Sequence, residues 1–229
     1  MNLYTRILAA SSLALTVGSA SAVSTFTETF DANDSGWLDE TGATPDYFAT
    51  GGVGGSGYIS YTPAPFNSGA GGFGDPLAIL LRGNAGSASG DAFVGDWLTS
   101  GVQTFSVDVR HNYDTALNLY TRLNRGFGQA ASSANNAIYT IAPNTWTTLT
   151  LEIEDTNPPF VSYGAGSFAS VFSGIADVQV GLYLPANTDF NNLTFDLDNV
   201  NVTVPEPASL GVVALAGLAS LRRRRSTAG

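Results

Sequence analysis

Two carboxylates lie where the sequence pattern otherwise places apolar side chains. Glu28 stands between two phenylalanines in the alternating stretch 25–30, and Asp198 lies in the apolar stretch 193–204. A buried carboxylate without a partner costs several kcal/mol or shifts its pKa. Both residues are therefore candidates for holding a cation that accepts oxygen ligands.

The alternation of apolar residues changes phase around Asp198. Leucine and phenylalanine take the odd-numbered positions before it, and valine takes the even-numbered positions after it. One extra residue at Asp198-Asn199, a β-bulge, would reconcile the two halves and is expected to turn Asp198 inward. The rival interpretation is a hydrogen-bonded or arginine-paired core carboxylate, with Arg82 as the arginine nearest to a buried pattern.

Catalytic residues are harder to find. His111 is the single histidine, no Gly-x-Ser-x-Gly motif accompanies it, and we expect it on a surface or loop. Glu152 and Glu154 share one face of a predicted strand, about 7 Å apart. Such a pair could serve a glycosidase, but charges that solvate a sheet face have the same spacing. We therefore predict a protein that is not an enzyme.

Aromatic side chains offer a second chemistry, stacking on sugar rings. Tyr120 and Tyr183 point away from the apolar stripe of their predicted strands, which makes them the candidate residues for glycan stacking. Trp37, Trp97 and Trp146 could also stack on sugars, but we expect them to pack in the core.

The elements that must position these residues are β-strands. Apolar and polar residues alternate, or form short apolar runs, in the stretches 25–30, 78–82, 104–110, 117–123, 146–154 and 177–184. Helical periodicity is confined to residues 166–175. Many short strands without intervening helices predict an all-β protein with a single antiparallel β-sandwich.

Charge narrows the range of partners. Between Val23 and Val204 the chain has 18 acidic residues against 4 arginines, a net charge of −14, and it contains no lysine. Such an acidic surface repels phosphate backbones, so we expect no binding to nucleic acid. The chain also has no cysteine, which excludes disulfides and thiolate metal sites.

Both ends of the chain resemble export signals. Arg6, the apolar stretch 7–17 and the small residues Ala20-Ser21-Ala22 predict a signal peptide over residues 1–22. Near the other end, the apolar run 208–221 has 14 residues, fewer than the roughly 20 that a membrane-spanning helix needs. Arginines after it favour a cytoplasmic end. We therefore expect a temporary anchor in the inner membrane.

The order of features in residues 204–229 resembles a PEP-CTERM sorting signal: a Pro-Glu-Pro triplet, a short apolar helix and an arginine cluster. The residues concerned are Pro205, Glu206, Pro207, Arg222, Arg223, Arg224 and Arg225. The resemblance implies that exosortase, a membrane protease-transpeptidase, cuts the tail. The protein would then pass to the cell surface or the extracellular matrix.

The region between the signals, residues 23–203, resembles laminin-type and carbohydrate-binding-module-like jelly rolls. The matching stretches are 30–37 and 54–60 in the first half and 144–153, 166–184 and 195–202 in the second. In such jelly rolls the first and last strands lie close, and a structural Ca²⁺ often joins them. The resemblance therefore implies a calcium site at Glu28 and Asp198, with carbonyl groups supplied by residues 51–57.

Together these features predict an exported, non-catalytic protein of the cell surface or extracellular matrix with a capacity to bind extracellular polysaccharide. Two alternatives stay open from the sequence. One is an enzyme that acts on extracellular polysaccharide through outward carboxylates, and the other is a purely structural surface protein.

Overall fold

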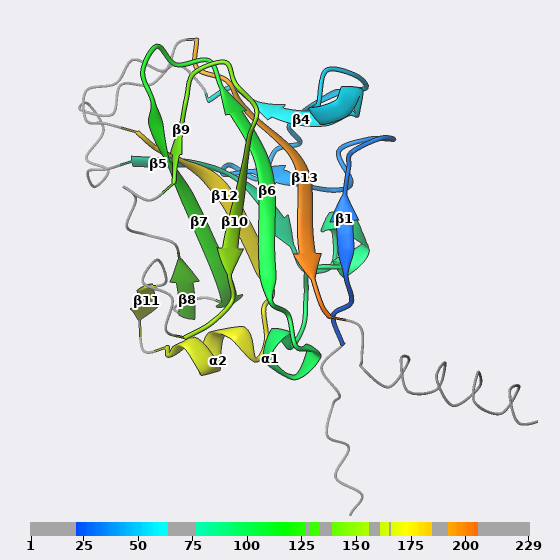
Figure 1. Ribbon diagram of the computed structural model, residues 1–229, viewed down its shortest axis with the longest axis vertical. Coiled ribbons are helices and arrows are strands. Elements are labelled where there is room, and N and C mark those ends of the chain that lie inside the picture. The colour runs from blue at the N-terminus through cyan, green and yellow to red at the C-terminus, as the bar shows by residue number, and fades with distance from the viewer. Residues whose placement is uncertain are drawn as a thin grey trace, which may run out of the picture.

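The computed structural model describes residues 22–63, 77–126, 129–132, 139–155, 161–164, 166–184 and 192–205. In this part of the chain two antiparallel sheets lie one behind the other, with the first sheet nearer the viewer in Figure 1. This arrangement confirms the predicted all-β class and the single antiparallel sandwich.

The first sheet has the strand order β10-β6-β13-β4-β3, and β1 also pairs with β13. One edge of β13 pairs with β4 and then, beyond the bulge, with β1, so the first and last described strands are neighbours, as the jelly-roll resemblance implies. The bounds are β1 Phe26–Glu28, β3 Asp46–Phe48, β4 Tyr58–Tyr61, β6 Thr104–His111, β10 Thr147–Glu152 and β13 Phe195–Thr203.

The second sheet has the order β11-β8-β7-β12-β5-β2, and β9 pairs with β7. Its centre is β12, which pairs with β5 on one side and with β7 on the other. The bounds are β2 Leu38–Asp39, β5 Leu77–Asn84, β7 Leu117–Gly126, β8 Gln129–Ser132, β9 Thr140–Ile141, β11 Val161–Gly164 and β12 Asp177–Leu184.

The core lies between the sheets and follows the period-two pattern of the strands. In β6, Phe105, Val107 and Val109 are buried against the facing sheet. Trp37 and Trp97 are fully buried in the same cluster, which confirms the core placement predicted for them. Trp146 is only half-buried, so the core prediction is wrong for that residue.

Short helices close one end of the sandwich (Figure 1). Helix α2, Phe168–Phe172, lies in the predicted helical stretch and begins with a capping box in which Ser167 and Ser170 bond reciprocally. Helix α1, Trp97–Ser100, was not predicted because four residues are too few to show a helical period. Its boundaries are local: Asp96 caps its first turn and Gly101 ends it in the left-handed conformation. Single 3₁₀ turns, η1 Val53–Gly55 and η2 Ala88–Asp91, complete the elements.

The predicted export signals lie almost entirely outside the described residues. This holds for residues 1–21 of the signal peptide and for Glu206, Pro207 and Arg222–Arg225 of the sorting signal, whereas Pro205 is described and exposed. No helix within the described ranges has the length and apolar character required to span a membrane.

Candidate functional site

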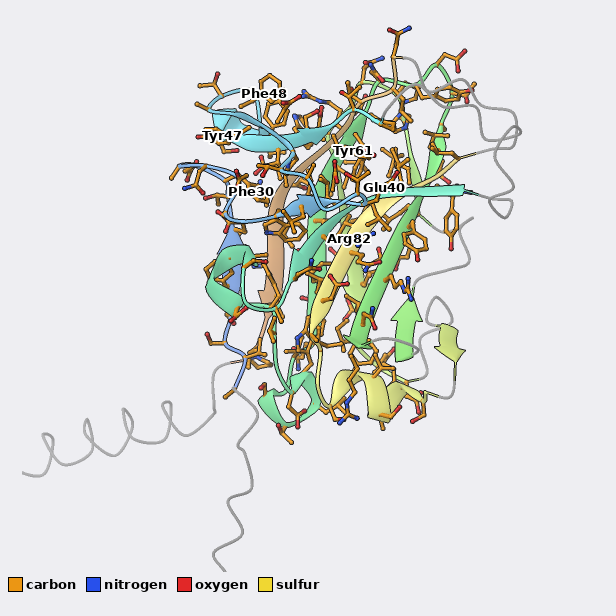
Figure 2. The ribbon with its side chains drawn as sticks, turned by 180° about the vertical axis from the view of Figure 1, so that it is seen from behind. Phe30, Glu40, Tyr47, Phe48, Tyr61 and Arg82 are labelled. Atoms are coloured by element: carbon orange, nitrogen blue, oxygen red, sulfur yellow. The ribbon has the colours of Figure 1, made fainter. Side chains whose placement is uncertain are left out.

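The outer face of the second sheet, the face turned away from the core, carries an unusual set of side chains. Along β12, Val178, Val180 and Leu182 are buried in the core, so alternation places Asp177, Gln179, Gly181 and Tyr183 outward. Strands β5 and β7 flank β12 and present their own outward residues beside these positions. Figure 2 shows the sandwich from this side.

Tyr120 and Tyr183 meet on this face. Tyr120 of β7 lies opposite Gly181, and its ring packs edge-on against Tyr183, with centroids 5.0 Å apart and planes at 89°. Both side chains are half-buried. Their predicted outward orientation is confirmed. Their contact could not be predicted, because it depends on the register between β7 and β12.

A polar row crosses the sheet next to the tyrosine pair. Gln179 lies opposite Arg82 of β5 on one side and Arg122 of β7 on the other, and Asp177 stands two residues before Gln179. The Gln179 amide donates a short hydrogen bond to Asp177. Since a residue in a strand advances the chain by about 3.3 Å, Gln179 and Tyr183 lie about 13 Å apart along β12, and Asp177 extends this stretch to about 20 Å.

The polar row has unused hydrogen-bonding capacity. Four of its buried atoms have no hydrogen-bond partner: Arg82 Nε, Arg122 Nε, Asp177 Oδ1 and Gln179 Oε1. Thr121 Oγ1, on the core side of β7, is the further such atom in the described part of the chain. A buried group of this kind costs about 1–3 kcal/mol, so each one calls for a physical reason. Two are donors and two are acceptors, the combination that neighbouring sugar hydroxyls can satisfy once side chains adjust around a ligand.

Burying the ionised carboxylate of the polar row is energetically unfavourable. Burial raises the pKa of Asp177, although the Gln179 hydrogen bond and the charges of Arg82 and Arg122 partly offset this. Arg82 also donates from Nη2 to the Glu40 carbonyl at 2.7 Å, and Glu40 accepts a hydrogen bond from the Tyr61 hydroxyl at 3.1 Å (Figure 2). Burial likewise raises the pKa of Glu40.

No sequence pattern marked Arg122, Gln179, Asp177 or Glu40 as members of a site. Polar residues at outward strand positions are the expected pattern for any solvated sheet face, so alternation alone gave no reason to choose them. Arg82 was considered only as a partner for Asp198 or Glu28. The structure places it in the second sheet instead, where it contacts Glu40.

Asp198 occupies a second candidate site, in the first sheet. The predicted bulge is confirmed, because the pairing of β13 with β6 shifts register between Asp198 and Asn201. Asp198 is fully buried, but the predicted inward direction is wrong. Leu197 packs in the core, so Asp198 faces the outer side, where the loop containing η1 covers it.

Hydrogen bonds, rather than an arginine, hold the Asp198 carboxylate. Its Oδ2 atom accepts from the Val53 amide and the Ser56 hydroxyl, both at 2.8 Å, and Oδ1 accepts from the Asn199 amide at 2.7 Å. Even so, burial raises the pKa of Asp198, and these three bonds only partly offset the effect. The nearby carboxylate of Asp108, opposite Asp198 in the register, raises it further.

Close packing of the loop around η1 brings backbone oxygens near Asp198 and near Phe30, the hydrogen-bond partner of Glu28. A Cβ on Gly52 would lie 2.5 Å from Asp198 Oδ2 and 2.5 Å from the Gly57 carbonyl oxygen. A Cβ on Gly57 would lie only 2.0 Å from the Phe30 carbonyl oxygen. Glu28 Oε1 in turn accepts from the Phe30 amide at 3.0 Å. The glycines thus allow the loop to pack directly on these oxygens.

This donor set suits a hard cation that accepts carbonyl oxygens. The described residues contain no group of three or more His, Cys, Asp or Glu side chains that could hold a metal ion by themselves. A cation between Glu28 and Asp198 would therefore depend on carbonyl groups such as those of Gly57 and Phe30, which is the ligand chemistry of Ca²⁺.

His111 is not the surface residue that was predicted. Its side chain is fully buried, Nε2 lies 2.9 Å from the Ile141 carbonyl oxygen, and Nδ1 accepts from the Tyr113 amide. Burial lowers the pKa of His111, so the neutral ring is favoured. Glu152 and Glu154 are both exposed, as predicted.

Comparisons with known proteins agree on architecture alone. No protein-family model and no curated protein matches the chain. Among solved structures, an exo-β-agarase matches with a TM-score of 0.50 at 16% identity, over 79% of this chain and 25% of that one. The present chain therefore spans about a quarter of that enzyme's length. The described part of the chain is a jelly-roll β-sandwich.

Two shorter solved structures match along nearly their whole length. One is the family 11 carbohydrate-binding module of the cellulosomal cellulase Lic26A-Cel5E of Clostridium thermocellum, with a TM-score of 0.46 at 16% identity, over 81% of this chain and 97% of that one. The other is the CBM22-1 xylan-binding domain of Paenibacillus barcinonensis Xyn10C, with a TM-score of 0.47 at 13% identity, over 82% and 100%.

Proposed function

We propose that this protein is a non-catalytic glycan-binding protein, which holds polysaccharide on the outer face of its second sheet. The observation that carries the proposal is the tyrosine pair beside the polar row. Tyr120 and Tyr183 offer aromatic surface for the apolar face of a sugar ring. The row of Arg82, Gln179 and Arg122 offers unmet hydrogen-bonding groups within one or two sugar units of that surface.

Loss of the tyrosine rings is expected to abolish most of the binding. In affinity electrophoresis or calorimetry against xylan, agarose and mixed-linkage β-glucan, the polysaccharide that binds the wild type should lose at least about tenfold in affinity for Tyr120→Ala or Tyr183→Ala, about 1.4 kcal/mol. The reason is the loss of ring stacking and of the apolar area that a sugar covers.

The matched control is Tyr183→Phe, which keeps the ring and removes only the hydroxyl. It should retain most of the affinity, and melting curves of all variants should show that they remain folded. Binding that survives both alanine variants would place the glycan elsewhere. Failure of the wild type to bind any member of a glycan array would contradict the proposal and favour the alternative of a purely structural surface protein.

We further propose that the protein reaches the cell surface or extracellular matrix through an exosortase, after temporary anchoring in the inner membrane. Support comes from the order of Pro205-Glu206-Pro207, the apolar run and Arg222–Arg225 in the sequence. Mass spectrometry of surface-released protein should show a mature form that lacks the four arginines. Intact peptides ending at Gly229 as the dominant species would contradict this sorting route.

A further inference from the structure

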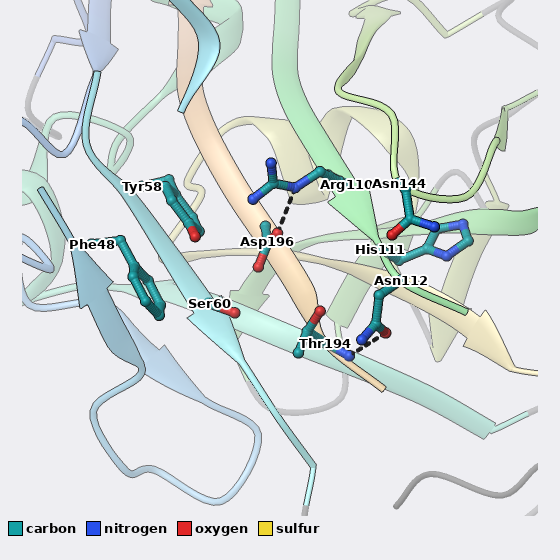
Figure 3. Close-up of a pocket in the computed structure, with 9 residues that line it drawn as sticks. All are labelled: Phe48, Tyr58, Ser60, Arg110, His111, Asn112, Asn144, Thr194 and Asp196. Carbon is teal, nitrogen blue, oxygen red and sulfur yellow. Dashed lines mark hydrogen bonds and ion pairs between the residues drawn. The ribbon is translucent and has the colours of Figure 1, made fainter. Parts of the chain in front are cut away.

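A pocket of about 250 Å³ opens on the outer face of the first sheet, the face opposite the tyrosine pair. It lies across β3, β4, β13 and the end of β6, as Figure 3 shows. Its lining combines aromatic rings, an arginine, a carboxylate and hydroxyl groups, contributed by Phe48, Tyr58, Arg110, Asp196, Ser60 and Thr194 among others.

One wall of the pocket is aromatic. Phe48 and Tyr58 lie opposite each other in the β3–β4 register, and their rings stack with centroids 4.9 Å apart and planes only 9° apart. Phe48 is 43% exposed, unusually high for a large apolar side chain in a sheet. The two rings cover each other's facing sides, so Phe48 carries the exposed part of this aromatic surface, and the stack fixes its orientation at little further cost in entropy to a ligand.

A fixed arginine and a carboxylate form the adjacent wall. Arg110 Nε donates to Asp196 Oδ2 at 2.7 Å, and the guanidinium lies 5.1 Å from the Tyr58 ring centroid and 4.4 Å from that of Trp146. Within the described residues, the terminal amino groups of Arg110 and the Oδ1 atom of Asp196 have no hydrogen-bond partner. These free donors and a free acceptor therefore stand side by side at fixed positions.

This combination suits a sugar ring. An aromatic wall can cover the C–H face of a pyranose, while a fixed donor and acceptor pair matches two of its hydroxyl groups. A cavity of about 150 Å³ accepts a benzene ring, so 250 Å³ leaves room for a six-membered ring and its hydroxyls.

Charge selects among sugars. The charge of Arg110 is already balanced by Asp196, and Asp46, Asp108 and Asp198 lie on the same face of the sheet. The region from Val23 to Val204 also carries a net charge of −14. A uronate or sulfated sugar would meet repulsion here, whereas a neutral sugar would not.

We propose that this pocket binds one neutral pyranose unit and is a second carbohydrate site, separate from the tyrosine pair. The proposal extends the proposed function but does not depend on it, since the two sites use opposite faces of the sandwich. Together the sites would let one protein hold two polysaccharide chains, a property suited to a matrix component.

The three indole N–H groups provide a direct test by nuclear magnetic resonance. Trp37 and Trp97 are fully buried and donate to Ser89 and to the Phe93 carbonyl, whereas Trp146, whose ring packs on the Arg110 guanidinium, donates to the Gly51 carbonyl. Titration of the ¹⁵N-labelled protein with the methyl β-pyranosides of glucose, galactose and xylose should shift the Trp146 indole signal saturably for at least one of them. The other two indole signals should not move.

Variants separate this pocket from the first site. Phe48→Ala and Arg110→Lys should each weaken the Trp146 response by about tenfold or more, through loss of the wall and of the planar donor group. Leu98→Ala, at an exposed apolar residue of helix α1 outside the pocket lining, should leave it unchanged. Tyr120→Ala should also leave it unchanged, even where that variant has lost polysaccharide binding.

The proposal fails if none of the neutral pyranosides shifts the Trp146 signal saturably, or if Phe48→Ala retains the full response. Tighter binding of glucuronate than of glucoside would overturn the neutral-sugar assignment. If both sites bind, the wild type should also raise the turbidity of a soluble polysaccharide that it recognises, and neither Phe48→Ala nor Tyr183→Ala should do so.

Discussion

Gly181→Ala is expected to lower the free energy of unfolding by about 3 kcal/mol or more, the upper part of the range for overpacked sites. A Cβ at this position would lie 1.7 Å from the Ile79 carbonyl oxygen and 2.8 Å from Leu80 Cα. Both contacts are with backbone, so no side-chain rotation can relieve them. The pairing of β12 with β5, at the centre of the second sheet, must move instead.

A loss of this size corresponds to a fall in melting temperature of about 6–12 °C for a protein of this length, which calorimetry or circular dichroism would measure. Gly174→Ala is the matched control, because its nearest contact is the flexible Arg125 side chain, at 3.3 Å. We expect that variant to melt near the wild type. If Gly181→Ala melts there too, β5 and β12 are not packed as closely as the structure has them.

Millimolar calcium is expected to raise the melting temperature of the wild type relative to chelator. We propose that Ca²⁺ binds between Glu28 and Asp198, with carbonyl ligands from the loop around Gly57 and from Phe30. A ligand at a hundredfold excess over its Kd stabilises the folded state by about 2.7 kcal/mol, or roughly 5–10 °C here. The bound cation would also offset the cost of burying the Asp198 carboxylate.

The variants Glu28→Gln and Asp198→Asn test this site by their response to calcium rather than by their absolute stability. Asp198→Asn replaces an acceptor of three hydrogen bonds, so it should destabilise the protein even without metal. Asp46→Asn, an exposed carboxylate in the same sheet, should keep the full calcium response. A wild-type midpoint indifferent to calcium, or a full response in both site variants, would exclude the site.

Acidification gives a further check with a defined sign. Burial raises the pKa of Asp198 above its ordinary value of 3.8, so the metal-free folded state holds this proton more tightly than the unfolded chain does. As the pH falls through the interval between the raised folded pKa and the unfolded pKa, protonation of Asp198 should stabilise the protein that a chelator keeps free of calcium. The calcium response should shrink in the same interval, because proton and metal compete for one carboxylate.

Local pattern was sufficient for the longer strands, whereas the short strands β2, β3, β4, β8 and β11 lie outside the predicted stretches. Alternation in residues 177–184 placed Val178, Val180 and Leu182 inward and Tyr183 outward, as the structure has them, because neighbouring side chains on any strand point to opposite faces. The bulge at Asp198 could also be predicted, since few other structures accommodate a change of parity within a buried strand. Gly181, inside a strand, was an available but unused sign of close backbone approach.

Contacts between strands and loops could not be predicted from the alternation of residues within one strand. Loop packing decided the environment of Asp198: the bulge predicted a change of direction, but the loop of Val53 and Ser56 buries the residue on the outer side. His111 was misplaced for a similar reason. It is buried because the Ile141 carbonyl from another strand, β9, packs against its ring.

By itself, the sequence determined an all-β sandwich with outward tyrosines, two carboxylates at positions of an apolar pattern and a strongly acidic surface. These features depend on side-chain type and on a period of two. Only the tertiary structure decided which of those residues meet. The register of β7 on β12 brings Tyr120 to Tyr183, and the register of β6 on β13 brings Arg110 to Asp196. The chemistry of each candidate site depends on such long-range pairing, since the energy of burying a polar group depends on the partners that the whole fold supplies.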